Sequence, residues 1–78
     1  MAVVRFFAAA AEAAGVEQTV VDAPSTGALR DQLVGAYGEQ FERVLNQCAL
    51  LVDGVRRDGD FPIADDSRVD VLPPFAGG

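Results

Sequence analysis

The chain has 78 residues, which is enough for one small domain and too few for two. It contains one cysteine and no histidine, which excludes an internal disulfide, a thiolate cluster, imidazole metal sites and histidine-dependent nucleophile pairs. All six basic residues are arginine and twelve residues are acidic, so the net charge of −6 argues against binding to nucleic acid or to anionic membranes. We therefore do not expect a self-sufficient enzyme.

The N-terminal segment resembles a secretion signal only superficially. Its apolar run, Phe6 to Ala11, has six residues, fewer than the roughly 7–15 of a signal h-region. No stretch approaches the ~20 apolar residues of a membrane span. We therefore expect a soluble, cytoplasmic protein.

The sequence predicts strands and helices that alternate along the whole chain. Each segment is recognised by its hydrophobic period and by the turn or capping residues that bound it. In chain order we expect a strand, a single helical turn, a strand, a capped helix, a shorter helical turn, a strand, a returning arm and a last strand: Val3–Phe7, Ala8–Ala14, Val16–Val21, Ser25 or Thr26 to Tyr37, Glu39–Leu45, Ala49–Val52, Val55–Arg57 and Arg68–Leu72.

Apolar and polar residues alternate along the first and last strands, and this alternation assigns each side chain to one of the two faces of the sheet. The continuous apolar run Ala49–Val52 is typical of a central strand that is buried on both faces, and Asp53-Gly54 is a strong hairpin signal after it. The core positions of the first and last strands are Val4, Phe6, Val69 and Val71, and the solvent positions are Arg5, Arg68 and Asp70.

The main predicted helix has one apolar stripe. Leu29 and Leu33 are four residues apart, and Ala36 or Tyr37 continues the same face. Gly35 lowers the helix propensity by about 1 kcal/mol relative to alanine and indicates a close approach of backbone at that turn.

The order of elements predicts an α+β fold with one main helix packed on one face of a mixed sheet of four to five strands. The right-handed crossover rule places the last strand beside the first. This arrangement is the β-grasp, or ubiquitin-like, architecture. We expect residues 1–73 to form the β-grasp domain and residues 74–78 to form a flexible C-terminal tail that ends in Gly-Gly.

Three groups of polar residues are candidate sites. A cluster of aspartates lacks the alternating ligands and closing glutamate of a calcium loop and is expected to be solvated turns. Cys48 borders an apolar run, has no positively charged sequence neighbour, and is expected to be a small hydrophobe. Arg56 and Arg57 predict either a solvated turn edge or a contact with a partner carboxylate. The aspartates are Asp58, Asp60, Asp65 and Asp66.

The C-terminal segment Leu72–Gly78 differs in kind from the rest of the chain. Pro73 and Pro74 cannot donate to a strand ladder, so they end the last strand and stiffen its exit. Phe75 follows beyond the reach of the core, and Gly77-Gly78 can enter a channel too narrow for a Cβ atom. A carboxylate on such a tail can be adenylated and then attacked by a sulfur or amine nucleophile, without any catalytic side chain of this protein.

Four segments resemble the sulfur-carrier family of small β-grasp proteins, and within it the small subunits of molybdopterin synthase, which end in Pro-Pro-x-x-Gly-Gly. The resemblance implies that a ubiquitin-activating-like enzyme uses ATP to adenylate Gly78, which then becomes a thiocarboxylate. It also implies that Gly77 and Ala76 thread into the large synthase subunit. The segments are Phe6–Ala8, Thr26–Arg30, Val52–Gly54 and Leu72–Gly78.

The same resemblance implies partner-groove contacts by Phe75, Pro74 and Pro73, sulfur transfer to a cyclic pterin precursor, and no cofactor or metal bound by the chain itself. Asp53 departs from the asparagine that relatives often carry at the hairpin.

Three alternatives remain open from the sequence. The acceptor could instead belong to thiamine or cysteine biosynthesis, the chain could be a ubiquitin-like modifier of lysines, or the tail could serve a plain binding module. The Pro73-Pro74 pair favours the molybdopterin pathway. The acidic composition further predicts basic patches on the partners and an association that weakens with salt.

Overall fold

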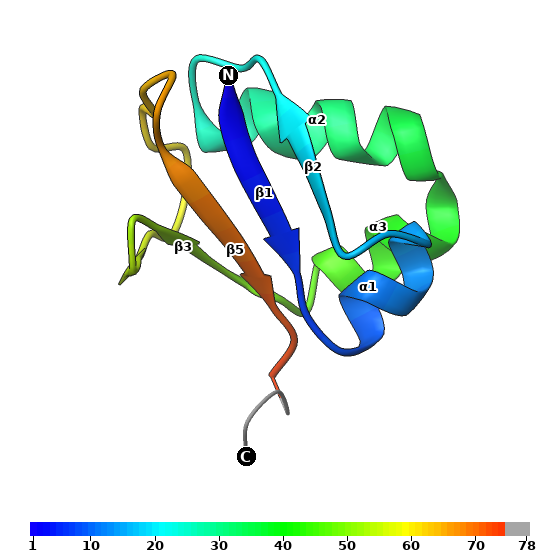
Figure 1. The fold of residues 1–78 in the computed structure, drawn as a ribbon. Helices are drawn as coiled ribbons and strands as arrows, with labels where there is room; N and C mark the ends of the chain where they lie inside the picture. The colour runs from blue at the N-terminus through cyan, green and yellow to red at the C-terminus, as the bar shows by residue number, and fades with distance from the viewer. Residues whose placement is uncertain (75–78) are drawn as a thin grey trace.

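The structure is a computed structural model and describes residues 1–74. Its elements follow the predicted order (Figure 1). They are β1 (Ala2–Phe6), α1 (Ala9–Ala14), β2 (Gln18–Val21), α2 (Thr26–Tyr37), α3 (Glu39–Leu45), β3 (Ala49–Val52), β4 (Val55–Arg56) and β5 (Arg68–Leu72).

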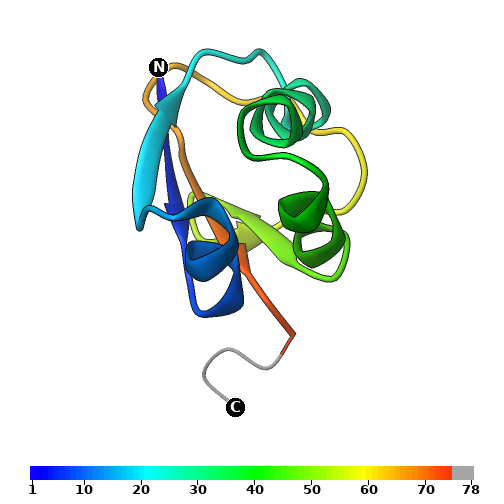
Figure 2. The ribbon, with the colours of Figure 1, turned by 90° about the vertical axis from the view of Figure 1, so that its right-hand side faces the viewer.

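The strands form one mixed sheet with the order β2-β1-β5-β3-β4. β1 and β5 run parallel, as the crossover rule predicts, and the other neighbouring pairs are antiparallel. The helices pack on one face of the sheet and leave the other face open (Figures 1 and 2). The β-grasp fold is therefore confirmed, with five strands in residues 1–74.

The core lies between the helices and the covered face of the sheet. All four predicted core positions of β1 and β5 are buried, because each strand alternates its side chains between the two faces. An edge-on aromatic cluster fills the end near α1: the ring centroid of Phe6 lies 5.7 Å from that of Tyr37 and 5.6 Å from that of Phe41. Tyr37, not the exposed Ala36, thus continues the stripe of α2. The buried apolar residues are Ala2, Val4, Phe6, Ala10, Val21, Leu29, Leu33, Phe41, Leu45, Leu50, Val52, Val69 and Val71.

The start of α2 is fixed by a side-chain cap and by the loop before β5. Ser25 is the capping residue, and its hydroxyl accepts a hydrogen bond from Ala28 N–H at 3.3 Å. Asp60 accepts a second bond from Gly27 N–H at 2.8 Å. The hydroxyl of Thr26, fully buried, donates to the carbonyl of Gly59 at 3.1 Å and accepts from Phe61 N–H at 2.9 Å. The loop 59–61 is therefore joined to the first turn of the helix.

The predicted hairpin is confirmed. Asp53 and Gly54 both have positive φ, 51° and 86°, as a two-residue hairpin turn of the primed type requires. The returning strand β4 ends at Arg56, one residue earlier than predicted.

The prediction that β3 is a central strand buried on both faces was wrong. Leu50 and Val52 are buried, but Ala49 and Leu51 on the other face are only half-buried. Helices cover one face of this sheet, so a continuous apolar run here does not mean two buried faces, and β5 takes the central position.

Two smaller predictions also need correction. Apart from its chain neighbours and the backbone of its own helix, no heavy atom would lie within 4 Å of a Cβ atom added at Gly35, so this glycine does not mark a close approach of another backbone segment. The second strand begins at Gln18, and Val16, which is 42% exposed, lies outside it. Among the described residues, no helix has the length and apolarity needed to cross a membrane.

Candidate functional site

The last strand of the sheet leads directly into the predicted tail. Within the described part of this segment, Pro73 is half-buried and Pro74 is exposed, directly after the end of β5 at Leu72. The predicted site residues Phe75, Ala76, Gly77 and Gly78 lie outside the described residues. The structure therefore places the base of the predicted tail and the surface around it.

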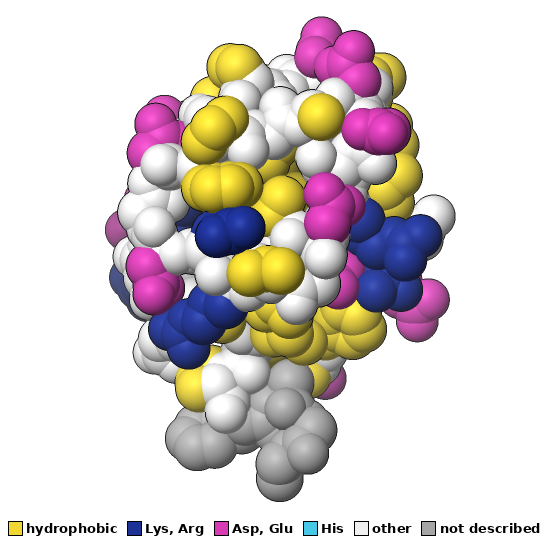
Figure 3. All heavy atoms as spheres, turned by 90° about the vertical axis from the view of Figure 1, so that its left-hand side faces the viewer, with side chains coloured by type: hydrophobic (Ala, Val, Ile, Leu, Met, Phe, Trp, Pro, Cys, Tyr) yellow, Lys and Arg dark blue, Asp and Glu magenta, His cyan; other side chains and the backbone are white. Residues whose placement is uncertain are grey.

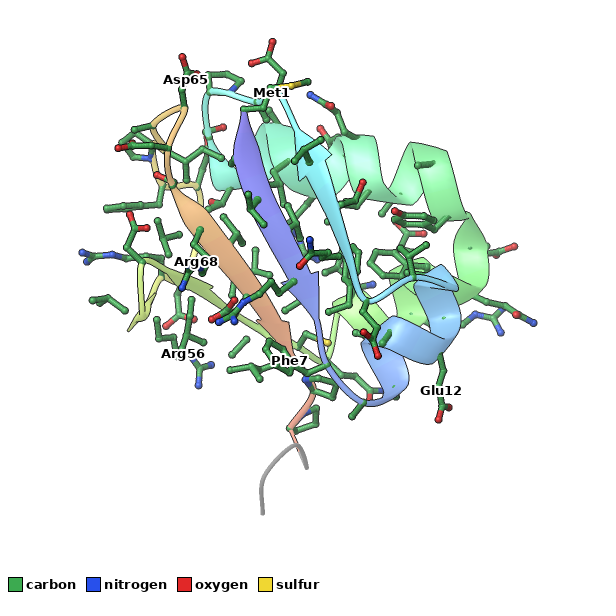
Figure 4. The ribbon with its side chains drawn as sticks, in the orientation of Figure 1. Met1, Phe7, Glu12, Arg56, Asp65 and Arg68 are labelled. Atoms are coloured by element: carbon green, nitrogen blue, oxygen red, sulfur yellow. The ribbon has the colours of Figure 1, made fainter. Side chains whose placement is uncertain are left out.

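The surface beside this exit is apolar. Phe6 pairs with Val71 in the parallel register of β1 and β5, so Phe7 and Leu72 come next to each other at the ends of the two strands. Ala49 of β3 pairs with Leu72 from the other side. Phe7, Leu72 and Ala49, all half-buried, thus form an apolar row across the sheet, and Figure 4 shows Phe7 next to the point where β5 ends.

An ion pair occupies the next row of the open face. The guanidinium of Arg5 on β1 donates to both carboxylate oxygens of Asp70 on β5, from Nε at 2.8 Å and from Nη2 at 3.1 Å. The hydrogen bond that Arg5 donates to Asp70 raises the pKa of Arg5 above its ordinary value, so Arg5 is charged at any physiological pH. The same guanidinium lies 5.4 Å from the ring centroid of Phe7.

Two shallow hollows lie on either side of Arg5. One, of about 360 Å³, lies toward β2 and the turn after β1 and includes Phe7, Glu17 and Gln18 in its lining. The other, of about 400 Å³, lies toward the far end of the sheet and includes Arg68, Asp70 and the hairpin turn. Figure 3 views the molecule from the side opposite the helices and shows arginine atoms among apolar side chains.

Cys48 lies away from this face. Burial raises the pKa of its thiol, and the nearby charge of Arg30 lowers it by less. Its sulfur donates to the carbonyl of Val44 at 3.1 Å. The half-buried, hydrogen-bonded thiol fits the prediction of a small packing residue, and its raised pKa disfavours the thiolate that a nucleophile needs.

Two of the four predicted turn aspartates, Asp58 and Asp60, and both residues of the Arg56–Arg57 pair have structural partners. Asp58 accepts from Arg56 at 3.3 Å on the surface, whereas Asp60 caps α2 and so is not merely a solvated residue. The Arg57 guanidinium stacks 4.2 Å from the ring centroid of Phe61. In residues 1–74, no three His, Cys, Asp or Glu side chains come together as metal ligands.

Neither the Arg5–Asp70 pair nor the Asp60 cap was predicted from the sequence. The first could have been found, because the predicted parallel pairing of the first and last strands brings two outward, oppositely charged residues together. No local pattern indicates the second, because Gly27 and Asp60 meet only through the tertiary fold.

Comparison with known proteins gives one family match. The sequence pattern of the ThiS family matches residues 4–78, and so extends through the whole predicted tail. Among curated proteins, no sequence matches the chain significantly.

Solved structures share the fold along nearly the whole chain. SAMP1 from Haloferax volcanii is 26% identical with a TM-score of 0.81, and the match covers 99% of this chain and 98% of that one. A chain from the complex of subunits 1 and 2 of molybdopterin-converting factor from Helicobacter pylori is 27% identical with a TM-score of 0.76, covering 99% and 97%. A putative molybdopterin converting factor subunit 1 from Pyrococcus furiosus, 21% identical with a TM-score of 0.82 and covering 94% and 95%, shows the fold alone.

Proposed function

Because the chain belongs to the ThiS family of β-grasp sulfur carriers, we propose that it carries sulfur as a thiocarboxylate at Gly78 and is the small subunit of molybdopterin synthase. The observation that carries this proposal is the family match through residue 78, which includes the Pro-Pro-Phe-Ala-Gly-Gly segment. The structural likeness to a chain of a molybdopterin-converting factor complex supports a large-subunit partner.

The proposed chemistry needs no catalytic side chain from this protein. A ubiquitin-activating-like enzyme transfers AMP from ATP to the Gly78 carboxylate and releases pyrophosphate. A sulfide or persulfide donor then displaces AMP and leaves the thiocarboxylate, with a reductant releasing the product where a persulfide is the donor. In the large synthase subunit, the cyclic pterin precursor takes the sulfur, and water returns the tail to the carboxylate. A dithiolene holds two sulfur atoms, so two loaded chains are consumed for each product.

The base of the tail suits insertion into a partner. Pro73 and Pro74 follow β5 directly, and the ring of each proline fixes the backbone angle φ and removes an N–H donor. A stiff exit lowers the entropy lost when the tail enters a channel. The pair also favours the molybdopterin pathway over carriers for thiamine or cysteine biosynthesis.

A ubiquitin-like modifier is the second candidate, and the likeness to SAMP1, also described as small archaeal modifier protein 1, favours it. The two functions share the adenylated Gly78 and differ in the nucleophile that receives the tail. A lysine ε-amine gives an isopeptide bond, whereas sulfide gives the thiocarboxylate.

The test is the intact mass of the protein after incubation with ATP, the adenylating enzyme and a sulfide source. We expect a gain that corresponds to one oxygen replaced by sulfur, and we expect none when Gly78 is deleted. Addition of the large subunit and the pterin precursor should then return the original mass. Capture on a lysine of another protein identifies the modifier, and no gain with several adenylating enzymes overturns sulfur carriage.

A variant at the tail separates binding from folding. Phe75→Ala is expected to weaken the complex with the large subunit, because burial of such a ring contributes roughly 1.5–3 kcal/mol. The melting temperature should stay unchanged if Phe75 serves the partner, and a large drop would place Phe75 in the core.

A further inference from the structure

The strand β2 forms one outer edge of the sheet (Figure 1). Phe6 N–H donates to the carbonyl of Glu17 at 2.8 Å, so these two residues are a hydrogen-bonded pair of the antiparallel β1–β2 ladder. Such pairs recur at every second residue, and the backbone groups of Thr19 therefore face β1 as well. The N–H and C=O groups of Gln18 and Val20 point the other way, away from the sheet.

The fold covers the end of this edge but not its middle. The carbonyl of Asp22, the next outward group along the chain, accepts a hydrogen bond from the side-chain amide of Gln32 on α2 at 2.7 Å. Within residues 1–74, no side chain forms a hydrogen bond with the backbone of Gln18 or Val20. Two donors and two acceptors are thus available to another strand.

β2 lacks the features that usually protect a sheet edge. Its four residues, Gln18–Val21, include no charge and no proline, and their register with β1 has no bulge. The other edge strand, β4, has only two residues, and one of them is the exposed Arg56. Val16 and Val20, which are 42% and 56% exposed, lie just before and on β2. Edge pairing is therefore favoured at β2 over β4.

We propose that β2 pairs with β2 of a second copy of this chain, antiparallel and with Thr19 on the two-fold axis. In this register, Gln18 of each copy lies opposite Val20 of the other, so the outward N–H and C=O groups of both strands pair with one another in four hydrogen bonds. The two Thr19 side chains face each other, which is a favourable cross-strand pair. The two-fold axis closes the assembly, so association stops at the dimer.

The charges near this edge permit the pairing but make it weak. Glu17 lies opposite Val21 of the other copy and Asp22 lies opposite Val16, so no carboxylate directly opposes another. Arg5 pairs with the first residue of β2 from inside the sheet and already binds an aspartate of β5. Each copy carries a net charge of −6, and a short edge buries little area. We therefore expect a reversible dimer that is strengthened by salt, because salt screens the repulsion.

The dimer leaves the predicted tail accessible. β1 separates β2 from β5, the strand that leads into the tail, and edge pairing covers neither face of the sheet. The inference therefore goes beyond the proposed function and does not depend on it.

Sedimentation equilibrium measures the pairing, with wild-type protein at about 10 µM to about 1 mM and at low and high salt. The average mass should rise with concentration toward that of a dimer and no further, and should rise more at high salt. Val20→Pro removes an outward N–H and spares the β1–β2 ladder, so it should raise the dissociation constant by about tenfold or more. Wild-type protein that stays monomeric throughout overturns the proposal.

Two matched variants keep the test valid if the proline variant fails to fold. Val20 and Val55 are 56% and 50% exposed and lie on opposite edges of the sheet. Val20→Asp and Val55→Asp add the same charge, with melting temperatures as the folding check. Val20→Asp should raise the dissociation constant of the dimer by about tenfold, and Val55→Asp should change it by less than about twofold. Equal effects overturn pairing through β2.

A disulfide tests the register in a Cys48→Ala background. Residues of a non-hydrogen-bonded antiparallel pair have Cα atoms about 4.5 Å apart, which is within the range that a disulfide spans. Thr19→Cys should therefore form a disulfide dimer with oxidised glutathione at least about fivefold faster than Gln18→Cys. Random collision predicts the opposite order, because Gln18 is exposed and Thr19 is half-buried. Faster cross-linking of Gln18→Cys overturns the proposed pairing.

Binding and mass measurements separate this proposal from the alternatives. If Val20→Pro weakens binding to the large synthase subunit while the wild type does not self-associate, the edge belongs to that subunit and the dimer is overturned. Because β2 lies away from the tail, Val20→Pro should gain sulfur as the wild type does. A wild type that dimerises but never gains sulfur retains the dimer and loses sulfur carriage, and a monomer that gains sulfur does the reverse.

Discussion

The hydroxyl of Thr26 joins two segments that are 33 and 35 residues away from it in the chain. Thr26→Val keeps the shape of the side chain but removes the acceptor for Phe61 N–H and the donor for the Gly59 carbonyl. Because buried polar groups that lose their partners are costly, we expect the free energy of unfolding to fall by about 2 kcal/mol in urea denaturation.

Thr19→Val is the control for this substitution. Thr19 is a half-buried strand residue with no side-chain hydrogen bond among the described residues, so its replacement should change stability by less than about 0.5 kcal/mol. Equal effects at the two positions would show that the bonds of Thr26 do not stabilise the fold.

The raised pKa of Cys48 predicts how the reactivity of its thiol depends on pH. Burial raises the pKa of its thiol in the folded state, so less thiolate is present at a given pH than in the unfolded chain. The rate of alkylation by iodoacetamide should therefore rise at a higher pH for the folded protein than for the same protein in denaturant. Arg30→Gln should move the folded profile to still higher pH, because the charge of Arg30 lowers this pKa.

The same shift has a consequence for stability. The folded state holds the thiol proton more tightly, so this contribution is fully present below the unfolded pKa of about 8.5 and is lost as the pH rises through the folded pKa. The unfolding free energy of wild type should thus fall more steeply above about pH 8.5 than that of Cys48→Ala. Parallel curves would contradict the raised pKa.

Single residues could be predicted from the sequence when a local pattern determined their environment. Val4, Phe6, Val69 and Val71 were placed in the core by alternation alone, because a strand has only two faces. The roles of Asp60 and Arg57 could not be predicted, since each depends on a residue that only the fold brings near: Gly27 for Asp60, Phe61 for Arg57. At the predicted covalent site, Gly78 lies outside the described residues, so its role stays a prediction.

At the scale of elements, α2 contains two glycines in different surroundings. A Cβ atom at Gly35 would meet nothing within 4 Å, whereas at Gly27 it would lie 2.7 Å from Oδ1 of Asp60. Gly35→Ala should therefore raise the free energy of unfolding by about 0.5–1 kcal/mol through helix propensity. Gly27→Ala must displace the Asp60 cap, so its free energy of unfolding should be about 1 kcal/mol lower than that of Gly35→Ala.

Urea denaturation of both alanine variants, with Asp60→Asn as a third, measures this difference. If Gly27→Ala stabilised as much as Gly35→Ala, Asp60 would not be a significant cap.

Elements with strong local signals were predicted within one or two residues. The capped helix α2 and the Asp53-Gly54 hairpin are examples, because capping and turn residues act over short distances. The prediction that β3 is buried on both faces was wrong because an apolar run does not show what covers each face of the sheet. The half-burial of Ala49 and Leu51 follows from the position of the helices on the other side of the sheet.

The topology of the whole molecule could be predicted because few arrangements satisfy a hairpin, one crossing helix and a right-handed connection. The charge distribution could be predicted only in part: alternation placed Arg5, Arg68 and Asp70 toward solvent, but it made no such prediction for Arg56. An acidic chain thus has arginines at three outward strand positions, and the sign of a partner's charge cannot be inferred from the net charge alone.

For the whole molecule, we predict that the core determines stability and that the C-terminal tail determines function. The described core ends at Val71, and Leu72 is the last strand residue, so deletion of residues 75–78 should change the melting temperature by less than about 2 °C. Val69→Ala, which removes buried methyl groups, should lower the unfolding free energy by roughly 2 kcal/mol and the melting temperature by about 8 °C or more. The truncated protein should keep its fold and gain no sulfur, whereas Val69→Ala should lose stability and still gain sulfur at a temperature where it remains folded. A truncated protein that melts as low as Val69→Ala would show that the predicted boundary between domain and tail is wrong.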